Sequence, residues 1–305
     1  MDGYYAGWDG GGTGTVVECA SSDGHILFRG KAGPLNFNGS TPEKIKATVL
    51  DAISQMNALP GGLEACLGLC IACAGSSSQA NRDLMERFLK EAGCHIPHLL
   101  VGDHESALSG ALEGKPGMVL ISGTGSICLG KNSQGQVHRC GGRGHLIDDG
   151  GSGYAIGRDI LSAVVQAEDG RIPFTLLTEM VYSHLDISGV EELIGFLYAP
   201  DTSKKEIASL APLAAKACEL GDSAAVRVES RAAEELFLLA ETTAKQLLLT
   251  RAPLAFSGSI LNKDSVIREL VAKKAKQSSF RLLPCLPSGD GAHGAVLIAR
   301  SHFPA

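Results

Sequence analysis

The chain lacks several features that would place it outside the ordinary globular proteins. It has no apolar run of the roughly 20 residues that a membrane helix requires. Residues 1–6 have neither a basic end nor a long apolar segment, so we expect no secretory signal. No basic run stands out among 27 basic and 33 acidic residues, and the net charge is −6. We therefore expect no nucleic-acid partner and no membrane surface.

The nine cysteines show no disulfide framework, because their number is odd and they are scattered along a long chain. We expect reduced thiols and a cytoplasmic location. Cys70 and Cys73 have the spacing of a metal or redox pair, but they stand in an apolar run that predicts a strand. Positions three apart on a strand point to opposite faces, so we interpret both as buried small apolar residues.

The composition is that of a globular α/β protein of about two domains. Apolar residues make up 44% and charged residues 20% of 305 positions, which suffices for real cores. Amphipathic patterns predict helices over residues 41–56 and 80–92, and residues 152–249 are almost wholly helical in pattern, with a long buried helix over 224–249. Short apolar runs predict strands over residues 67–74, 98–101, 118–122, 127–130 and 253–256.

An internal repeat accompanies this pattern. Gly12 and Gly123 lie 111 positions apart, and so do the later turn glycines Gly24 and Gly135. Each pair belongs to a predicted meander of strand, glycine turn, strand, turn and strand. The turn-rich residues 113–117 are the best boundary between the two copies, so we predict one domain on each side.

The first turn of each meander has the composition of an anion cradle. Such turns let the backbone approach an anion and direct N–H groups at it, with a hydroxyl to help. Two related turns, one in each domain, could hold a triphosphate between them. Asp9 would repel phosphate unless a cation lies between, and Mg²⁺ bound to ATP supplies that cation. The residues predicted to bind the phosphates are Gly10, Gly11, Gly12, Thr13, Gly123, Thr124, Gly125 and Ser126.

Two other phosphate motifs are excluded. A Walker A loop needs a lysine after its last glycine, and residues 10–15 have none. Residues 289–294 match G-x-G-x-x-G but stand too close to the end of the sequence for a following βαβ unit. We interpret Gly291 and Gly294 instead as positions where a capped helix packs closely.

These segments resemble a known superfamily. Residues 9–15, Asp103, residues 122–126 and residues 257–259 are similar to the phosphate-1, connect, phosphate-2 and adenosine segments of the actin/hexokinase/Hsp70 ATPases. Residues 119–126 and 140–154 further resemble the N-acetylglucosamine kinase-like group among the BadF/BadG/BcrA/BcrD-type ATPases, and the resemblance spans essentially the whole chain.

The resemblance implies two ribonuclease H-like domains, an actin-like ATPase duplication, around a central cleft. Residues 1–115 would form the N-terminal lobe, with a C-terminal helix at about 290–305 packing back onto it. Residues 116–290 would form a larger, helix-rich lobe.

The resemblance also implies roles for individual residues. Asp103 would align the sugar hydroxyl and accept its proton. The alternative is that Asp103 caps the helix predicted over residues 105–112. Asn36 would contact the sugar, although loop turn chemistry also explains an asparagine there. The implied sugar-binding residues are Asn36, Gly75, Asp103, Gly144, His145 and Asp149, and the implied adenosine-binding residues are Gly258 and Ser259.

The glycine-rich loop over residues 141–153 departs from the family pattern. The family often has Trp at the position of Arg143, Gly at that of Asp148 and Glu at that of Gly150. We interpret Arg143 as an ordinary surface arginine. The alternative is that it binds a carboxylate through two parallel hydrogen bonds, which would suit an acidic sugar such as N-acetylmuramic acid.

The sequence thus predicts an ATP-dependent and Mg²⁺-dependent kinase for a primary hydroxyl of an amino sugar, foremost N-acetylglucosamine. N-acetylmuramic acid and glucosamine are alternative substrates. An ATPase activator of the 2-hydroxyacyl-CoA dehydratase type is an alternative function, which would need a cysteine-held iron–sulfur cluster. The expected partner is a small sugar, and a homodimer is compatible with the resemblance.

Overall fold

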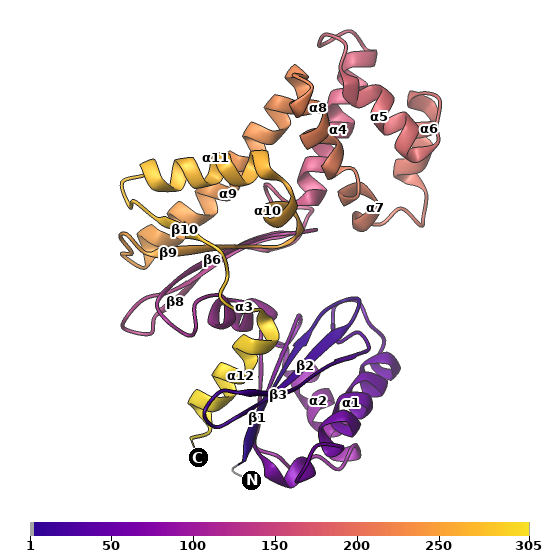
Figure 1. Cartoon of the computed structure of the whole chain (residues 1–305). Helices are drawn as coiled ribbons and strands as arrows, with labels where there is room; N and C mark the ends of the chain where they lie inside the picture. The colour runs from indigo at the N-terminus through magenta and orange to yellow at the C-terminus, as the bar shows by residue number, and fades with distance from the viewer. Residues whose placement is uncertain (1–2, 305) are drawn as a thin grey trace. The chain divides into compact units, whose positions relative to one another are not determined.

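The computed structural model describes residues 3–304, which divide into two compact units (Figure 1). Unit 1 comprises Met1–Lys115 and Pro287–Ala305, and unit 2 comprises Pro116–Leu286. The division after Lys115 falls inside the turn-rich residues 113–117. The last segment of the chain belongs to unit 1, where its helix lies beside β1 and α3. Ala305, the last residue of the predicted C-terminal helix, lies outside the described residues.

Unit 1 is built on a mixed five-stranded sheet in the order β3-β2-β1-β4-β5. The first three strands form an antiparallel meander, and β4 and β5 continue parallel to β1. Its strands are β1 (Tyr4–Gly10), β2 (Thr15–Ser21), β3 (Ile26–Ala32), β4 (Cys66–Cys73) and β5 (His98–Val101). Its helices are α1 (Pro42–Asn57), the short η1 (Gly62–Ala65), α2 (Gln79–Glu91), α3 (Asp103–Ala111) and α12 (Gly291–His302).

Strand alternation separates two cores on the faces of this sheet. Trp8 and its even-numbered neighbours in β1 pack with α1 and α2, whereas Tyr5 packs with α12. Cys73 belongs to the first core and Cys70 to the second, and both are fully buried. The prediction that these two cysteines point to opposite faces is confirmed.

Unit 2 has a second mixed sheet, in the order β10-β9-β6-β7-β8. Its helices pack into a separate core rich in alanine and leucine. The strands are β6 (Gly117–Ser122), β7 (Ser126–Lys131), β8 (Val137–Gly141), β9 (Pro253–Ser257) and β10 (Leu283–Cys285). The helices are α4 (Gly153–Glu168), α5 (Leu176–Leu185), α6 (Val190–Tyr198), α7 (Lys204–Ala208), α8 (Ala211–Glu219), α9 (Ser223–Gln246), α10 (Ser259–Lys263) and α11 (Ser265–Gln277).

The internal repeat is confirmed by topology and by hydrogen bonds. Each sheet has an antiparallel meander followed by two parallel strands, in the same spatial order. The second turn of the first meander has bonds from Ser21 N to His25 O and from Gly24 N to Ser21 O, both 2.9 Å long. Asn132 and Gly135 make the equivalent bonds in the second meander, at 3.0 and 3.1 Å.

The long helix α9 confirms the prediction of a buried helix over residues 224–249, with a slightly earlier end. Asp222 caps its start by accepting hydrogen bonds from the backbone N–H groups of Ala224 and Ala225. It ends at Gln246, and Leu248 has a φ of 53°, which no α-helix contains. Within residues 3–304, none of the helices combines the length and hydropathy of a membrane span.

Glu229 is an acid buried inside the helical core of unit 2. It has no exposed surface, and neither carboxyl oxygen has a hydrogen-bond partner within the described residues. Burial, and then the neighbouring carboxylate of Asp264, raise the pKa of Glu229 to about 9. The folded protein therefore holds Glu229 as a neutral acid at pH 7.

This burial predicts a stability that falls as the pH rises. The unfolded chain releases the Glu229 proton above its ordinary pKa of 4.5, whereas the folded chain keeps it until about 9, so the loss occurs between these values. We expect Glu229→Gln to remove most of the fall between pH 7 and 9 in urea unfolding at pH 5, 7 and 9. The exposed Glu234 on the same helix supplies the control Glu234→Gln, which should keep the slope. An unchanged slope in Glu229→Gln would contradict the assignment.

Candidate functional site

In each unit, several of the predicted site residues lie at the carboxyl ends of parallel strands, the edge where open α/β sheets bind ligands. In unit 1, Gly10 ends β1, Gly75 follows β4 and Asp103 follows β5. In unit 2, Ser122 ends β6 and Gly258 follows β9. Residues separated by up to about 135 positions thus come to the same edge of one sheet.

The first glycine turn, over residues 11–14, joins β1 to β2. Gly11 N donates to Gly14 O at 2.9 Å, and Gly11, Gly12 and Thr13 are exposed. Gly10 is buried, and an added Cβ would lie 2.6 Å from the side chain of Leu35. Gly10 therefore permits close packing, while the three residues after it are exposed. The N–H and carbonyl groups of Gly11 are engaged by Gly14 and Leu35.

One predicted sugar-contacting residue, Asn36, lies beside this turn, and a second, Gly75, lies beside the neighbouring Asn38. A Cβ on Gly12 would lie 3.6 Å from Asn36 Nδ2. Asn36 Oδ1 accepts a hydrogen bond from Asn38 N at 2.8 Å, so its oxygen makes the local turn and its amino group faces the glycine turn. Gly75 has a φ of 83°, and an added Cβ would lie 3.0 Å from Asn38 Oδ1. The structure thus brings Asn36 to the first turn, and it brings Gly75 to the loop that contains Asn36.

Asp9 lies on the α12 face of the sheet, because strand alternation places it with Tyr5 and Gly7. Its carboxylate lies so close to α12 that a Cβ on Gly291 would stand 2.4 Å from Asp9 Oδ2. Burial, and then the carboxylates of Asp103 and Asp290, raise the pKa of Asp9 to about 6. A divalent cation beside Asp9 would favour its charged form.

Asp103 is the first residue of α3 and half of its side chain is exposed. Its Oδ1 accepts a hydrogen bond from His104 N at 3.0 Å. The alternative role of Asp103 as the helix cap is wrong, because Gly102 occupies the cap position and Gly102 N donates to Glu105 Oε1 at 3.0 Å. The helix also begins two residues before the predicted Glu105.

The second glycine turn, over residues 123–125, joins β6 to β7 and is shorter than the first. Gly123 N donates to Gly125 O at 2.9 Å. Gly153 N donates to Gly123 O at 2.7 Å, and the Ser126 hydroxyl donates to Gly150 O at 2.7 Å. The loop before α4 is therefore hydrogen-bonded to this turn, and the Ser126 hydroxyl makes one of these bonds.

Asp149 lies buried against this second turn. It has a φ of 65°, an unusual backbone conformation that aspartate tolerates better than most residues. Asp149 Oδ1 accepts a hydrogen bond from Ser126 N at 3.4 Å, and a Cβ on Gly125 would lie 3.0 Å from Asp149 Oδ2. The residue predicted to contact the sugar thus also supports the turn predicted to contact the phosphates.

The predicted adenosine turn packs onto the same region of unit 2. Gly258 has a φ of 90°, and an added Cβ would lie 2.3 Å from the carbonyl oxygen of Ser122. A Cβ on Gly123 would lie 3.8 Å from Ser259 Oγ. Gly258 and Ser259 therefore adjoin the second glycine turn.

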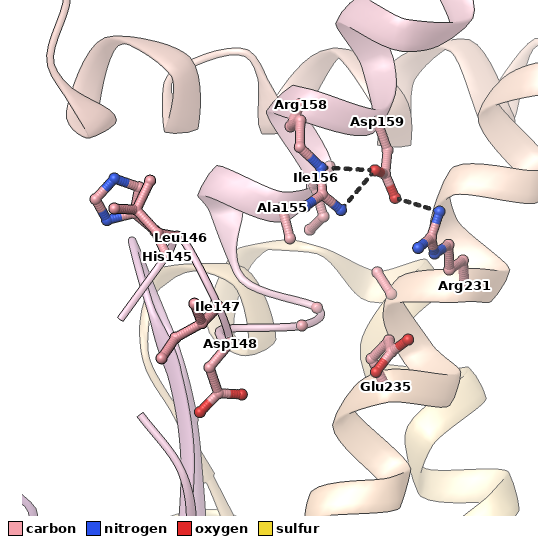
Figure 2. A pocket seen from close by; sticks show the side chains of 13 residues that line it. His145, Leu146, Ile147, Asp148, Ala155, Ile156, Arg158, Asp159, Arg231 and Glu235 are labelled. Carbon is pink, nitrogen blue, oxygen red and sulfur yellow. Dashed lines mark hydrogen bonds and ion pairs between the residues drawn. The ribbon is translucent and has the colours of Figure 1, made fainter. Parts of the chain in front are cut away.

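The loop over residues 141–153 borders a pocket of about 320 Å³ in unit 2 (Figure 2). Gly144 is exposed, and His145 packs edge-on against Tyr154 with ring centroids 4.7 Å apart. Arg143 is exposed, and its N–H donates to Asp148 Oδ2 at 2.9 Å. The charged residues from the helices that line the pocket are Arg158, Asp159, Arg231 and Glu235.

Sequence reasoning missed these four helix residues, because nothing local marks them. Asp159 accepts hydrogen bonds from Arg158 and lies 3.5 Å from Arg231, as Figure 2 shows. Arg158 and Arg231 belong to α4 and α9, and only tertiary packing brings the two helices together.

Magnesium and a nucleotide fit this set of donors. Within residues 3–304, no three His, Cys, Asp or Glu side chains are placed to hold a metal ion together. Mg²⁺ bound to a nucleotide needs only one or two protein carboxylates, since phosphates and water supply the remaining ligands. Asp9 offers such a carboxylate near the end of β1, just before the exposed residues Gly11, Gly12 and Thr13.

The comparisons with known proteins agree with this arrangement. The sequence profile of the BadF/BadG/BcrA/BcrD ATPase family matches residues 6–299. The chain belongs to this family. It is 34% identical, over 98% of both chains, to the N-acetylmuramic acid/N-acetylglucosamine kinase of Clostridium acetobutylicum. It is 31% identical, over 97% of both chains, to the N-acetyl-D-glucosamine kinase of Dictyostelium discoideum.

Solved structures show the same fold as this BadF/BadG/BcrA/BcrD-type ATPase. A protein from Chromobacterium violaceum, described as an inferred N-acetylglucosamine kinase, has a TM-score of 0.76 and 27% identity, covering 97% of this chain and 98% of that one. A glucokinase of the ROK family from Streptomyces griseus has a TM-score of 0.56 and 16% identity, covering 98% and 100%. The predicted fold class is thereby confirmed.

The contact between Gly258 and Ser122 can be tested in this ATPase by Gly258→Ala. The new methyl group would clash with a backbone carbonyl, so we expect a loss of about 1–3 kcal/mol in unfolding free energy and weaker binding of an ATP analogue. Gly170→Ala is the matched control, because Gly170 also has a positive φ, of 74°, with nothing within 4 Å. Equal loss of nucleotide affinity in both variants would show that the turn has no special role.

Proposed function

We propose that this chain is an ATP-dependent kinase that phosphorylates a primary hydroxyl of an amino sugar, foremost N-acetylglucosamine. The observation that carries the proposal is the gathering of Asp9, the first glycine turn, Asn36 and Gly75 at one edge of a sheet. Asp103 follows the neighbouring strand at that edge. Near-full-length similarity to two kinases of N-acetylated amino sugars supports it.

The residues of this chain would bind the nucleotide, orient the sugar hydroxyl and accept its proton. Mg²⁺ with ATP, when bound, supplies the phosphoryl group and neutralises charge on it. Asp103 would orient the sugar hydroxyl and accept its proton, and its half-exposed carboxylate is suited to reach a ligand. The exposed N–H groups of Gly12 and Thr13 would stabilise charge on the phosphates, while Asp9 would hold the metal ion, directly or through water.

The second turn would complete the nucleotide site through Gly123, Thr124 and Gly125, with Gly258 and Ser259 next to the adenosine. Ser126 supports this turn instead of binding phosphate, because it is buried and its hydroxyl and N–H donate to Gly150 and Asp149. The proposal requires both turns to meet one nucleotide, which stays a prediction. Gly144, His145 and Asp149 stay predicted sugar contacts. A homodimer, a cytoplasmic location and the absence of nucleic-acid and membrane partners also stay predictions.

The alternative of a dehydratase activator is not favoured by the cysteines. An iron–sulfur cluster takes thiolate ligands, and burial raises the pKa of both Cys70 and Cys73 while their side chains lie in different cores. The solved structure of the (R)-2-hydroxyglutaryl-CoA dehydratase component A of Acidaminococcus fermentans has a TM-score of 0.51 at 10% identity, which shows a shared fold alone.

The central test of the proposal is ADP release measured with glucose, glucosamine, N-acetylglucosamine and N-acetylmuramic acid. We expect the N-acetylated sugars to give the highest kcat/KM. The same assay on Asp103→Asn should show turnover lowered by about 10²–10⁴-fold, because the variant cannot accept the proton. Affinity for an ATP analogue should stay within about twofold, since Asp103 faces the sugar.

The exposed Asp83 on α2 supplies the control Asp83→Asn, which should retain full turnover. Parallel loss of nucleotide binding in Asp103→Asn would show that Asp103 is misassigned. No ADP release with any of the four sugars would overturn the proposed function itself.

Arg143 offers a test of the finer substrate preference. Its exposed guanidinium would bind the lactyl carboxylate of N-acetylmuramic acid, which N-acetylglucosamine lacks. Arg143→Gln should raise KM for N-acetylmuramic acid about tenfold and leave KM for N-acetylglucosamine within about twofold. Arg171→Gln, at another exposed arginine, should change neither value. If both sugars lose affinity equally in Arg143→Gln, Arg143 does not read the carboxylate.

A further inference from the structure

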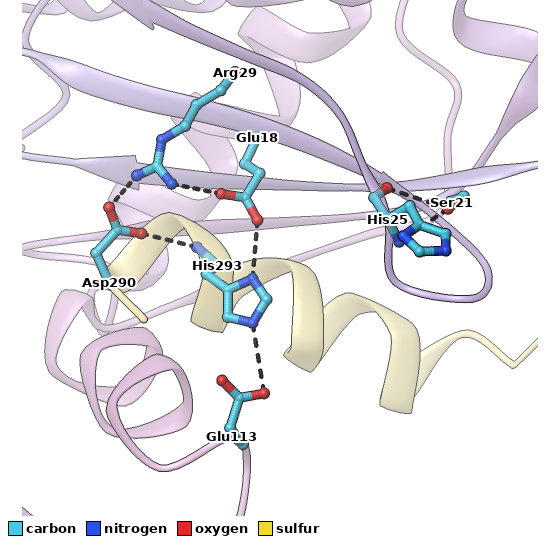
Figure 3. Close-up of polar contacts among 7 residues, drawn as sticks. All are labelled: Glu18, Ser21, His25, Arg29, Glu113, Asp290 and His293. Atoms are coloured by element: carbon cyan, nitrogen blue, oxygen red, sulfur yellow. Dashed lines mark hydrogen bonds and ion pairs between the residues drawn. The ribbon is translucent and has the colours of Figure 1, made fainter. Parts of the chain in front are cut away.

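A cluster of charged side chains ties α12 to the sheet of unit 1 (Figure 3). We call it the Glu18 cluster, and its members are Glu18, Arg29, Glu113, Asp290 and His293. Glu18 lies at its centre with no exposed surface. It accepts a hydrogen bond from Arg29 Nη1 at 2.8 Å and lies 3.0 Å from His293 Nδ1.

Strand alternation explains why Glu18 can reach α12. Val17 and Cys19 pack into the core on the other face, so Glu18 points to the α12 face. Its partner across the strands is Gly7, and a Cβ on Gly7 would lie 2.4 Å from Val296 N. The missing side chain lets α12 approach the sheet, which brings His293 to Glu18.

His293 links this buried carboxylate to both neighbours of the helix. Its Nε2 lies 3.7 Å from Glu113 Oε2, just after α3. Its backbone N–H donates to Asp290 Oδ1 at 3.2 Å, the cap of α12, and Asp290 in turn pairs with Arg29. Without the imidazole, Glu18 would keep one partner, and a buried charge that loses a partner is strongly destabilised.

The end of α12 that this cluster holds is the end that contacts Asp9. Gly291, the first helical residue, leaves no room for a Cβ beside the Asp9 carboxylate, as described above. The next turn is equally close to α3, since a Cβ on Gly294 would lie 1.8 Å from Ser106 O and one on Gly110 would lie 1.9 Å from Asp290 O. A shift of this helix end would therefore move the backbone of α12 that contacts the Asp9 carboxylate.

We propose that His293 is a positioning residue for Asp9: with Glu18 and Asp290, it fixes the first turn of α12 and thereby the orientation of the Asp9 carboxylate toward the metal ion of the nucleotide. The inference rests on the proposed function in one respect, the binding of a nucleotide with Mg²⁺. It does not depend on which sugar is phosphorylated.

The test measures ADP affinity by calorimetry, with Mg²⁺ and with EDTA, in a matched set of variants. In His293→Ala, affinity for ADP with Mg²⁺ should fall about 10–100-fold, the usual effect of losing a residue that orients a metal ligand. Affinity with EDTA should change less than about threefold, because the glycine turn binds phosphate without Asp9. In the kinase assay, KM for the sugar should stay unchanged while KM for MgATP rises.

Two conservative variants distinguish the contacts of the ring. His293→Asn places an amide nitrogen where Nδ1 faces Glu18, and it should restore the affinity with Mg²⁺ to within about threefold of the original chain. His293→Gln places its amide nitrogen where Nε2 faces Glu113, and it should restore less. This comparison keeps the proposal falsifiable if His293→Ala fails to fold.

The control is His25→Ala. His25 is exposed in the turn between β2 and β3 (Figure 3), and its ring lies 3.4 Å from the Asp23 carboxylate. This variant should change the affinity for ADP neither with Mg²⁺ nor with EDTA. Equal losses with Mg²⁺ and EDTA in His293→Ala, or no advantage of Asn over Gln, would overturn the proposal. If the unsubstituted chain binds ADP with Mg²⁺ but phosphorylates no sugar, the proposed kinase function is refuted. The inference about His293 and Asp9 is not affected by that result.

Discussion

Close approach between backbone and carboxylate at Gly291 is the constraint around which the edge of the first sheet is arranged. The helix α12, from the C-terminal part of the chain, packs against Asp9 through Gly291, where a Cβ would not fit beside the carboxylate. The contact puts a carboxylate at the N-terminal end of α12, where the helix dipole favours negative charge. Burial and two neighbouring carboxylates act in the opposite direction on Asp9. The net effect on Asp9 is a pKa raised to about 6.

The two copies of the meander share one topology, but their glycine turns differ in length and in exposure. The first glycine turn encloses four residues and leaves three of them exposed, while the second encloses three and is held by Gly153 and Ser126. Both lie at the carboxyl ends of parallel strands. The duplication therefore supplies two related turns, one open and one supported by the loop before α4.

Buried acids are handled in two distinct ways in this chain. Glu18 keeps its place because Arg29 and His293 surround it. Glu229 has no such partner among the described residues, and its pKa rises until the neutral form prevails. The first arrangement joins β2, β3 and α12 in unit 1, whereas the second lies within the helical core of unit 2.

The amino-acid sequence by itself indicated the turns, the repeat and the strands other than β10 (Leu283–Cys285), since these depend on local periodicity and on glycines at a constant offset. It also indicated the opposed faces of Cys70 and Cys73, because alternation along a strand is local. Only the tertiary structure decided that Asp149 supports the second glycine turn and that Glu18 meets His293, 275 positions away. Such contacts depend on how helices pack onto a sheet. That packing cannot be predicted from the local sequence around each residue.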